Sequence, residues 1–196
     1  MSLPVAILIS GAGTNMAALI GDMARPGHPA HPVLVIASTP EAGGIAVARA
    51  AGVPVEVISR RAHDRAGFEA AIAAALDHAG ARLICLAGFM HILSPGFVAP
   101  RAGRILNIHP SLLPKYPGLD THARALAAGE HAHGCTVHEV TEALDAGPFL
   151  GQGRVPVLPD DTPATLAARV QAMEHRLYPA VLCRVAAGER GVLELP

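Results

Sequence analysis

Short apolar runs alternate with alanine-rich stretches along most of the chain. The apolar runs predict strands at residues 4–10, 31–38, 53–59, 81–88 and 104–110. The stretches between them predict helices near residues 15–23, 43–51 and 65–80. Strands that are apolar on both faces are typical of a parallel sheet with helices on either side. The pattern therefore predicts an α/β protein with a doubly wound, mostly parallel sheet.

The pattern changes toward the C-terminus. Residues 135–141 alternate small or apolar side chains with polar ones, and residues 149–157 form a second run after a Gly-Pro turn. This alternation favours an antiparallel addition to the sheet. A last long helix is predicted over residues 162–187, capped by Asp161 or Thr162.

Composition narrows the class of protein. The 196 residues are 51% hydrophobic and 16% charged, which excludes a disordered chain and predicts a single domain, residues 1–196. A net charge of -1 offers no basic field for nucleic acid or for a membrane surface. No apolar run reaches the ~18 residues of a membrane span, and the first residues do not resemble a signal peptide. Three scattered cysteines fit a reducing compartment, so we expect a soluble, cytoplasmic protein.

A glycine-rich turn, residues 10–15, joins the first predicted strand to the first helix. Glycines allow close approach of a ligand, and a helix N-terminus offers free N–H groups, so the turn favours a single phosphate. The alternative is a tight turn with a helix cap. Asn15-Met16 replaces the Lys-Ser/Thr of a Walker loop, and Ser38-Thr39 stands where a dinucleotide site carries an acid. NADP remains open as a ligand.

Asn107 and His109 lie at the end of the fifth predicted strand. Residues i and i+2 of a strand face the same side, so an amide and an imidazole are expected to point together into the ligand cleft. Asp145, in a Gly/Pro loop, is either a turn former or a carboxylate that holds the His109 tautomer and stabilises its imidazolium form. His131 and His133 form the densest histidine cluster, but no constellation of acids or thiolates lies near them, so no metal is predicted.

Four segments together resemble the phosphoribosylglycinamide formyltransferases, the folate-dependent enzymes of purine synthesis. They are LISGAGTN, LAGFMHILSPGFV, AGRILNIHPSLLPKYPGLDTH and GCTVHEVTEALDAGP, and the likeness covers nearly the whole chain. The resemblance implies transfer of the formyl group of 10-formyltetrahydrofolate, as co-substrate, to the amine of glycinamide ribonucleotide. It also implies a nucleotide-phosphate half at about residues 1–100 and a folate and catalytic half at about 101–196. This chain departs from the family pattern at Ala12, at His91 in place of Arg, and at Asp120 in place of His.

The resemblance also implies the site residues. The catalytic set would be Asn107, His109 and Asp145. The residues implied to bind the ribonucleotide are Gly13, Thr14, Asn15, Gln171 and Glu174. The residues implied to bind the folate are Arg65, Met90, His91, Ile92, Leu93, Asn107, Val140, Thr141, Glu142, Ala143, Leu144 and Asp145. A cis peptide bond is implied before Pro114.

The implied chemistry is an attack of the glycinamide amine on the formyl carbon. Asn107 and protonated His109 would donate hydrogen bonds to the oxyanion, and Asp145 would orient His109 and raise its affinity for a proton. The alternatives are a hydrolase that releases formate from the same folate, an initiator-tRNA formyltransferase, an NADP-dependent reductase and a purine-nucleotide sensor. The expected partners are small-molecule substrates alone, with the chain as a monomer or a homodimer.

Overall fold

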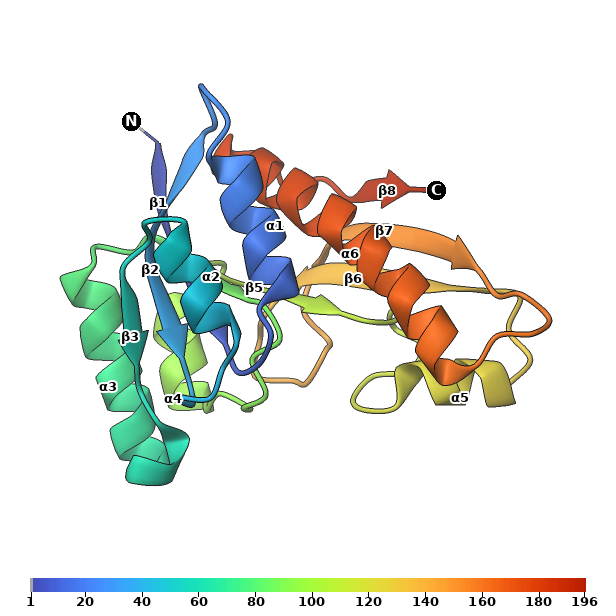
Figure 1. The fold of residues 1–196 in the computed structure, drawn as a ribbon, viewed down its shortest axis with the longest axis horizontal. Coiled ribbons are helices and arrows are strands. Elements are labelled where there is room, and N and C mark those ends of the chain that lie inside the picture. The colour runs from blue at the N-terminus through green and yellow to red at the C-terminus, as the bar shows by residue number, and fades with distance from the viewer. Residues whose placement is uncertain (1) are drawn as a thin grey trace.

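A computed structural model, which describes residues 2–196, contains one eight-stranded sheet with the order β3-β2-β1-β4-β5-β6-β7-β8 (Figure 1). The strands are β1 (Leu3–Ile9), β2 (Ala30–Ala37), β3 (Val55–Val57), β4 (Leu83–Leu86), β5 (Ile105–His109), β6 (Ala132–Glu139), β7 (Phe149–Pro156) and β8 (Leu193–Leu195). The α-helices are α1 (Thr14–Met23), α2 (Gly44–Ala50), α3 (Arg65–His78), α4 (Pro95–Val98), α5 (Thr121–Ala127) and α6 (Pro163–Ala186). Two 3-10 turns, η1 (Arg60–Ala62) and η2 (Ala99–Arg101), complete the regular elements.

Strand pairing confirms the predicted fold class. Strands β1 to β5 pair in parallel. Strand β6 then runs antiparallel to both β5 and β7, and β8 pairs in parallel with β7 at the edge of the sheet. The antiparallel addition lies directly beside β5, so it forms one wall of the space at the carboxyl end of that strand.

Helices cover both faces of the sheet because the central strands are apolar on both sides. Val5, Ile7 and Ile9 of β1 pack in one buried cluster with residues of α1, α2 and α6. Ala6 and Leu8 face the opposite way and pack with residues of α3 and α4. Figure 1 shows the two layers, with α6 running beside α1 and across β6 and β7.

Helix α6 is the longest of these elements, and it is hydrogen-bonded to the central strands β4 and β5. Thr162 caps it through a capping box with Thr165, which confirms the second of the two predicted caps. The buried Tyr178 hydroxyl lies 3.1 Å from the carbonyl oxygens of both Leu86 and Leu106, which belong to β4 and β5. The helix is therefore fixed to the end of β4 and to the residue of β5 that precedes Asn107.

The differences from the prediction concern short elements. Helices α4 and α5, the two 3-10 turns and strand β8 were not predicted, since each is seven residues or fewer and has little periodicity of its own. Strand β6 begins at Ala132 rather than Cys135 because Ala132 already pairs with Pro156 of β7. Strand β3 is limited to three residues. Within residues 2–196, no helix combines the length and the apolar character needed to cross a bilayer.

Candidate active site

The carboxyl end of β5 opens into a cavity of about 360 Å³. Asn107 and His109 both line it, as their i, i+2 spacing predicted. The opposite wall is the segment from Val140 to Asp145, and the turn from Phe89 to Leu93 forms a third side. Gly118 and Leu119 of the loop after β5 also line it, so the cavity brings together segments that are distant in the sequence.

His109 is buried and has an oxygen atom near each ring nitrogen. Its Nε2 lies 2.9 Å from the Tyr116 carbonyl oxygen, which can only accept, so Nε2 carries a hydrogen. Its Nδ1 lies 3.4 Å from Oδ2 of Asp145. An acceptor at both nitrogens is the arrangement that an imidazolium ring requires. The contact at Nδ1 is the longer of the two, so the hydrogen on Nδ1 is the one that a ligand oxygen can share with Asp145.

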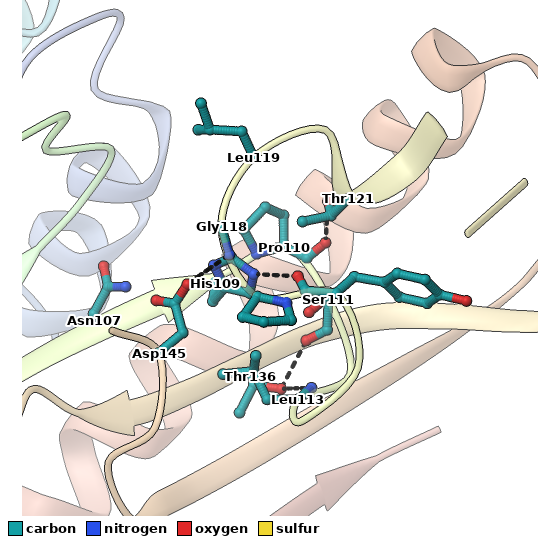
Figure 2. Close-up of polar contacts among 12 residues, drawn as sticks. Asn107, His109, Pro110, Ser111, Leu113, Gly118, Leu119, Thr121, Thr136 and Asp145 are labelled. Atoms are coloured by element: carbon teal, nitrogen blue, oxygen red, sulfur yellow. Dashed lines mark hydrogen bonds and ion pairs between the residues drawn. The ribbon is translucent and has the colours of Figure 1, made fainter. Parts of the chain in front are cut away.

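Asp145 reaches this position through a left-handed backbone conformation, with φ of 50°. Its side chain is only 7% exposed, and Oδ2 accepts a hydrogen bond of 2.9 Å from the Gly118 backbone N–H (Figure 2). The loop around Gly118, which follows β5, and the loop of Asp145, which follows β6, are thus joined at the carboxylate. The Asp145 carboxylate therefore joins the two loops and also faces the His109 imidazole.

His138 belongs to the same cluster, although the sequence interpretation did not select it. The antiparallel register pairs Asn107 with His138 and His109 with Thr136. Nδ2 of Asn107 lies 3.2 Å from Nε2 of His138, and Oδ1 of Asp145 lies 3.7 Å from the same nitrogen. The alternation of residues 135–141 placed His138 on a strand, but only the register with β5 places it beside Asn107.

Buried polar contacts from β6 and β7 hold the loop that follows His109. The Thr136 hydroxyl donates to the Ser111 carbonyl and accepts from the Leu113 N–H, at 2.7 and 3.0 Å (Figure 2). Gln152 of β7 donates to the Leu113 carbonyl at 2.8 Å. The Leu113–Pro114 peptide bond is cis, which confirms the bond that the resemblance implied. These contacts fix the path of the loop that carries the Tyr116 carbonyl to His109.

A second cavity, of about 270 Å³, lies over the glycine-rich turn. It is lined by the turn itself, residues 10–15, and by Ala87, Gly88, Met90 and Gln171. Gly13 occupies the N-cap position of α1 with φ of 74°, and it has no side chain with which to cap the helix. The free N–H groups of the first turn of α1 therefore remain available to an anion.

Helix α6 contributes Gln171 to this second cavity, and its Glu174 contacts Asn15 of the turn. Nε2 of Gln171 donates to the Thr14 hydroxyl at 3.2 Å, and Nδ2 of Asn15 donates to Oε2 of Glu174 at 2.8 Å. Oδ1 of Asn15 is buried and has no hydrogen-bond partner among residues 2–196. Glu174 is buried, and this burial raises the pKa of its carboxyl, an effect that the Asn15 hydrogen bond partly opposes.

This burial predicts that Glu174→Gln raises the melting temperature at neutral pH. The folded protein binds the Glu174 proton more tightly than the unfolded chain does, so the associated stability is present at acidic pH and is lost as the pH rises. Glutamine removes the buried charge, and its Oε1 can still accept from Asn15. Thermal unfolding should show a higher Tm for the variant at pH 7 and a difference that shrinks toward pH 4. A Tm at pH 7 equal to or below that of the parent would contradict this expectation.

The remaining selected residues lie at the larger cavity or at its rim. Met90 to Leu93 and Val140 to Asp145 line the cavity. Arg65 does not line it, but its guanidinium donates to the Ile92 carbonyl at 3.1 Å, which places it beside the opening. His91 packs edge-on against Phe68 and Phe89, and burial together with the nearby Arg60 charge lowers its pKa.

Met90 lines both cavities. Its backbone N–H donates to the Ser10 hydroxyl at 2.9 Å, so the turn after β4 is joined to the turn after β1. Each cavity is lined by residues from both sides of residue 100. Among the side chains of residues 2–196, no group of three histidine, cysteine, aspartate or glutamate residues is arranged to hold a metal ion.

Comparison with known proteins gives a consistent set of relatives. The family model described as "Formyl transferase" matches residues 3–182. The phosphoribosylglycinamide formyltransferase of Escherichia coli (strain K12) is 42% identical over 185 residues, which cover 94% of this chain and 87% of that protein. The trifunctional purine biosynthetic protein adenosine-3 of Gallus gallus is 46% identical over 185 residues, but the chain spans only 18% of its length.

Solved structures show the same likeness. The crystal structure of phosphoribosylglycinamide formyltransferase from Brucella melitensis superposes with a TM-score of 0.92 and 54% identity, covering 96% of this chain and 97% of that one. The phosphoribosylglycinamide formyltransferase from Coxiella burnetii, in complex with CHES, superposes with a TM-score of 0.92 and 43% identity over the full length of both chains.

Proposed function

The chain belongs to the formyl transferase family, and from this premise we propose that it is a phosphoribosylglycinamide formyltransferase of de novo purine biosynthesis. It transfers the formyl group of 10-formyltetrahydrofolate to the amine of N1-(5-phospho-D-ribosyl)glycinamide. The observation that carries this proposal is the pair of cavities that meet at Met90, with Asn107, His109 and Asp145 grouped in the larger one. Two cavities with a shared wall suit a reaction between two bound molecules.

The two substrates are assigned by their chemistry. The ribonucleotide phosphate lies on Gly13, Thr14 and Asn15, where the first turn of α1 supplies N–H groups. Glu174 and Gln171 face the ribose hydroxyls as acceptor and donor. The folate occupies the larger cavity, whose sides are Met90 to Leu93 and Val140 to Asp145, and Arg65 lies at the rim for the carboxylate tail.

The reaction requires stabilisation of one oxyanion and movement of one proton. The glycinamide amine attacks the formyl carbon, and negative charge develops on the formyl oxygen. Asn107 donates to this oxygen from Nδ2, and His109 donates to it from Nδ1. Nε2 of His109 already donates to the Tyr116 carbonyl. The bond between the formyl carbon and N10 of the folate then breaks as a water molecule carries the amine proton to N10. Fixed donors supply the stabilisation without reorganisation during the reaction.

Asp145 supports this chemistry through His109. Its carboxylate lies 3.4 Å from Nδ1, it is nearly buried, and the Gly118 N–H fixes its orientation. It therefore balances the positive charge of an imidazolium ring in a site with little water. One chain contains all of these residues, so the proposed site needs no second copy. The proposed location is the cytoplasm, in keeping with the free cysteines Cys85, Cys135 and Cys183.

The test is the release of tetrahydrofolate from 10-formyltetrahydrofolate, followed with and without the ribonucleotide. Release that depends on the ribonucleotide, together with formation of the formylated ribonucleotide, is the expected result. Release of formate at the same rate in both reactions would identify a hydrolase instead. Absence of release in either reaction would overturn the proposed function.

A further inference from the structure

His138 is a buried titratable group that the proposed reaction does not use. It is 2% exposed, and the register of β5 and β6 places it directly across from Asn107. Its imidazole lies near the side chains of Asn107, Asp145 and His109 and the carbonyl oxygen of Glu139. These surroundings determine which hydrogen atoms the ring can carry.

The contact at Nδ1 defines the tautomer. Nδ1 lies 3.0 Å from the Glu139 carbonyl oxygen, which can only accept, so Nδ1 must carry a hydrogen. In the neutral ring, Nε2 then has a free lone pair and needs a donor. Nδ2 of Asn107, at 3.2 Å, is that donor. A protonated ring would have a hydrogen on Nε2 and could no longer accept from Asn107.

We propose that His138 is a positioning residue for catalysis: its neutral Nδ1–H tautomer holds the Asn107 carboxamide with the NH2 group toward Nε2. One amide hydrogen is then bound to His138, and the second remains for the formyl oxygen in the cavity. The flipped carboxamide would present its own carbonyl oxygen to a developing negative charge. The catalytic consequence rests on the proposed function, whereas the tautomer and the amide orientation do not.

The charged neighbours favour the same state. Burial lowers the pKa of His138, and His109 lowers it further, whereas the Glu139 carbonyl and Asp145 act in the opposite direction. Oδ1 of Asp145 is 3.7 Å from Nε2, which is beyond hydrogen-bond distance, while Oδ2 faces His109 and Gly118. A neutral His138 therefore does not compete with His109 for the Asp145 carboxylate.

The orientation can be tested without any substrate. Nitrogen-15 NMR of the full chain at pH 7 should show His138 with a protonated Nδ1 and an unprotonated Nε2, and a scalar coupling across the hydrogen bond from Asn107 Nδ2 to Nε2. A ring protonated at Nε2 would overturn the proposal, whatever the activity of the protein. The histidine signal is assigned by its loss in His138→Gln.

The catalytic effect is tested with two replacements. His138→Phe keeps a ring but removes the acceptor, and it should lower kcat about 10-fold or more, up to the ~10²–10³-fold that loss of a whole oxyanion donor costs. The KM for the ribonucleotide, which binds in the other cavity, should stay unchanged. His138→Gln provides an acceptor through Oε1 and should recover a large part of kcat. Equal losses of kcat in both variants would contradict the proposed role.

A double-mutant cycle separates positioning from general damage. If His138 acts through Asn107, His138→Phe should have little further effect on kcat in an Asn107→Ala background. Losses that multiply would show that His138 acts independently of Asn107 and would overturn the proposal. If the unmodified protein itself shows no ribonucleotide-dependent release, the proposed function fails, and the NMR measurement still decides the inference.

Discussion

Replacement of His109 by alanine is expected to lower kcat for ribonucleotide-dependent tetrahydrofolate release by about 10²–10³-fold. The Tyr116 carbonyl at Nε2 and Asp145 at Nδ1 position the imidazole, so the ring is already oriented before the substrates bind. Alanine removes both the donor and the ring that faces Asp145. Steady-state rates measured at saturating concentrations of both substrates give the effect directly.

The matched control for this variant is His131→Ala. His131 is exposed, lies just before β6, and contacts neither cavity through its side chain. Its replacement should leave kcat within about twofold of the parent, because surface substitutions away from a site usually have small effects. Circular dichroism and thermal unfolding confirm that both variants fold. Near-parent transfer by His109→Ala would remove this residue from the mechanism.

Replacement of Gly147 by alanine is expected to inactivate the protein without touching a substrate. A Cβ at this position would overlap the Glu139 carbonyl oxygen and lie 2.9 Å from its carbonyl carbon, so the backbone must move. The loop that moves is the one that holds Asp145 against His109. A displacement of about 1 Å can cost about 10²-fold in rate, and forced backbone shifts cost typically about 1–3 kcal/mol in stability. Initial rates and urea unfolding measure the two effects.

Gly21→Ala is the corresponding control. Gly21 lies within α1, and a Cβ there would meet no atom within 4 Å among residues 2–196, apart from its chain neighbours and the backbone of its own helix. Alanine in a helix interior is favoured over glycine by roughly 0.5–1 kcal/mol, so this variant should be as stable as the parent or more stable, with unchanged kcat. A Gly147→Ala protein that retained both stability and rate would show that the loop adapts to the side chain.

The sequence predicts what depends on local pattern. The apolar runs predicted strands β1 to β5 and their helices within a few residues, because a continuous apolar run is a local signal. Asn107 and His109 could be predicted for the same reason, because a strand end and an i, i+2 spacing are local features. Both side chains do line one cavity.

What remained hidden depends on contacts between distant segments. His138 was passed over because nothing near it in the sequence specifies which residue of β5 lies opposite. The contact between Asn15 and Glu174 joins residues 159 positions apart, and only the resemblance indicated Glu174. Helix α5 begins after Asp120, which has φ of 57° and makes no side-chain cap, so the usual start signal is missing. Pairing and register arise from the folded sheet rather than from local preference.

The position of Met90 in the walls of both cavities has a kinetic consequence. On the proposed function each cavity holds one substrate, so both substrates can be bound at the same time, on either side of Met90. The formyl group can then pass directly from the folate to the ribonucleotide, without a covalent intermediate on the protein. We therefore expect turnover through a ternary complex, with initial-rate lines at different fixed concentrations of one substrate that converge instead of running parallel.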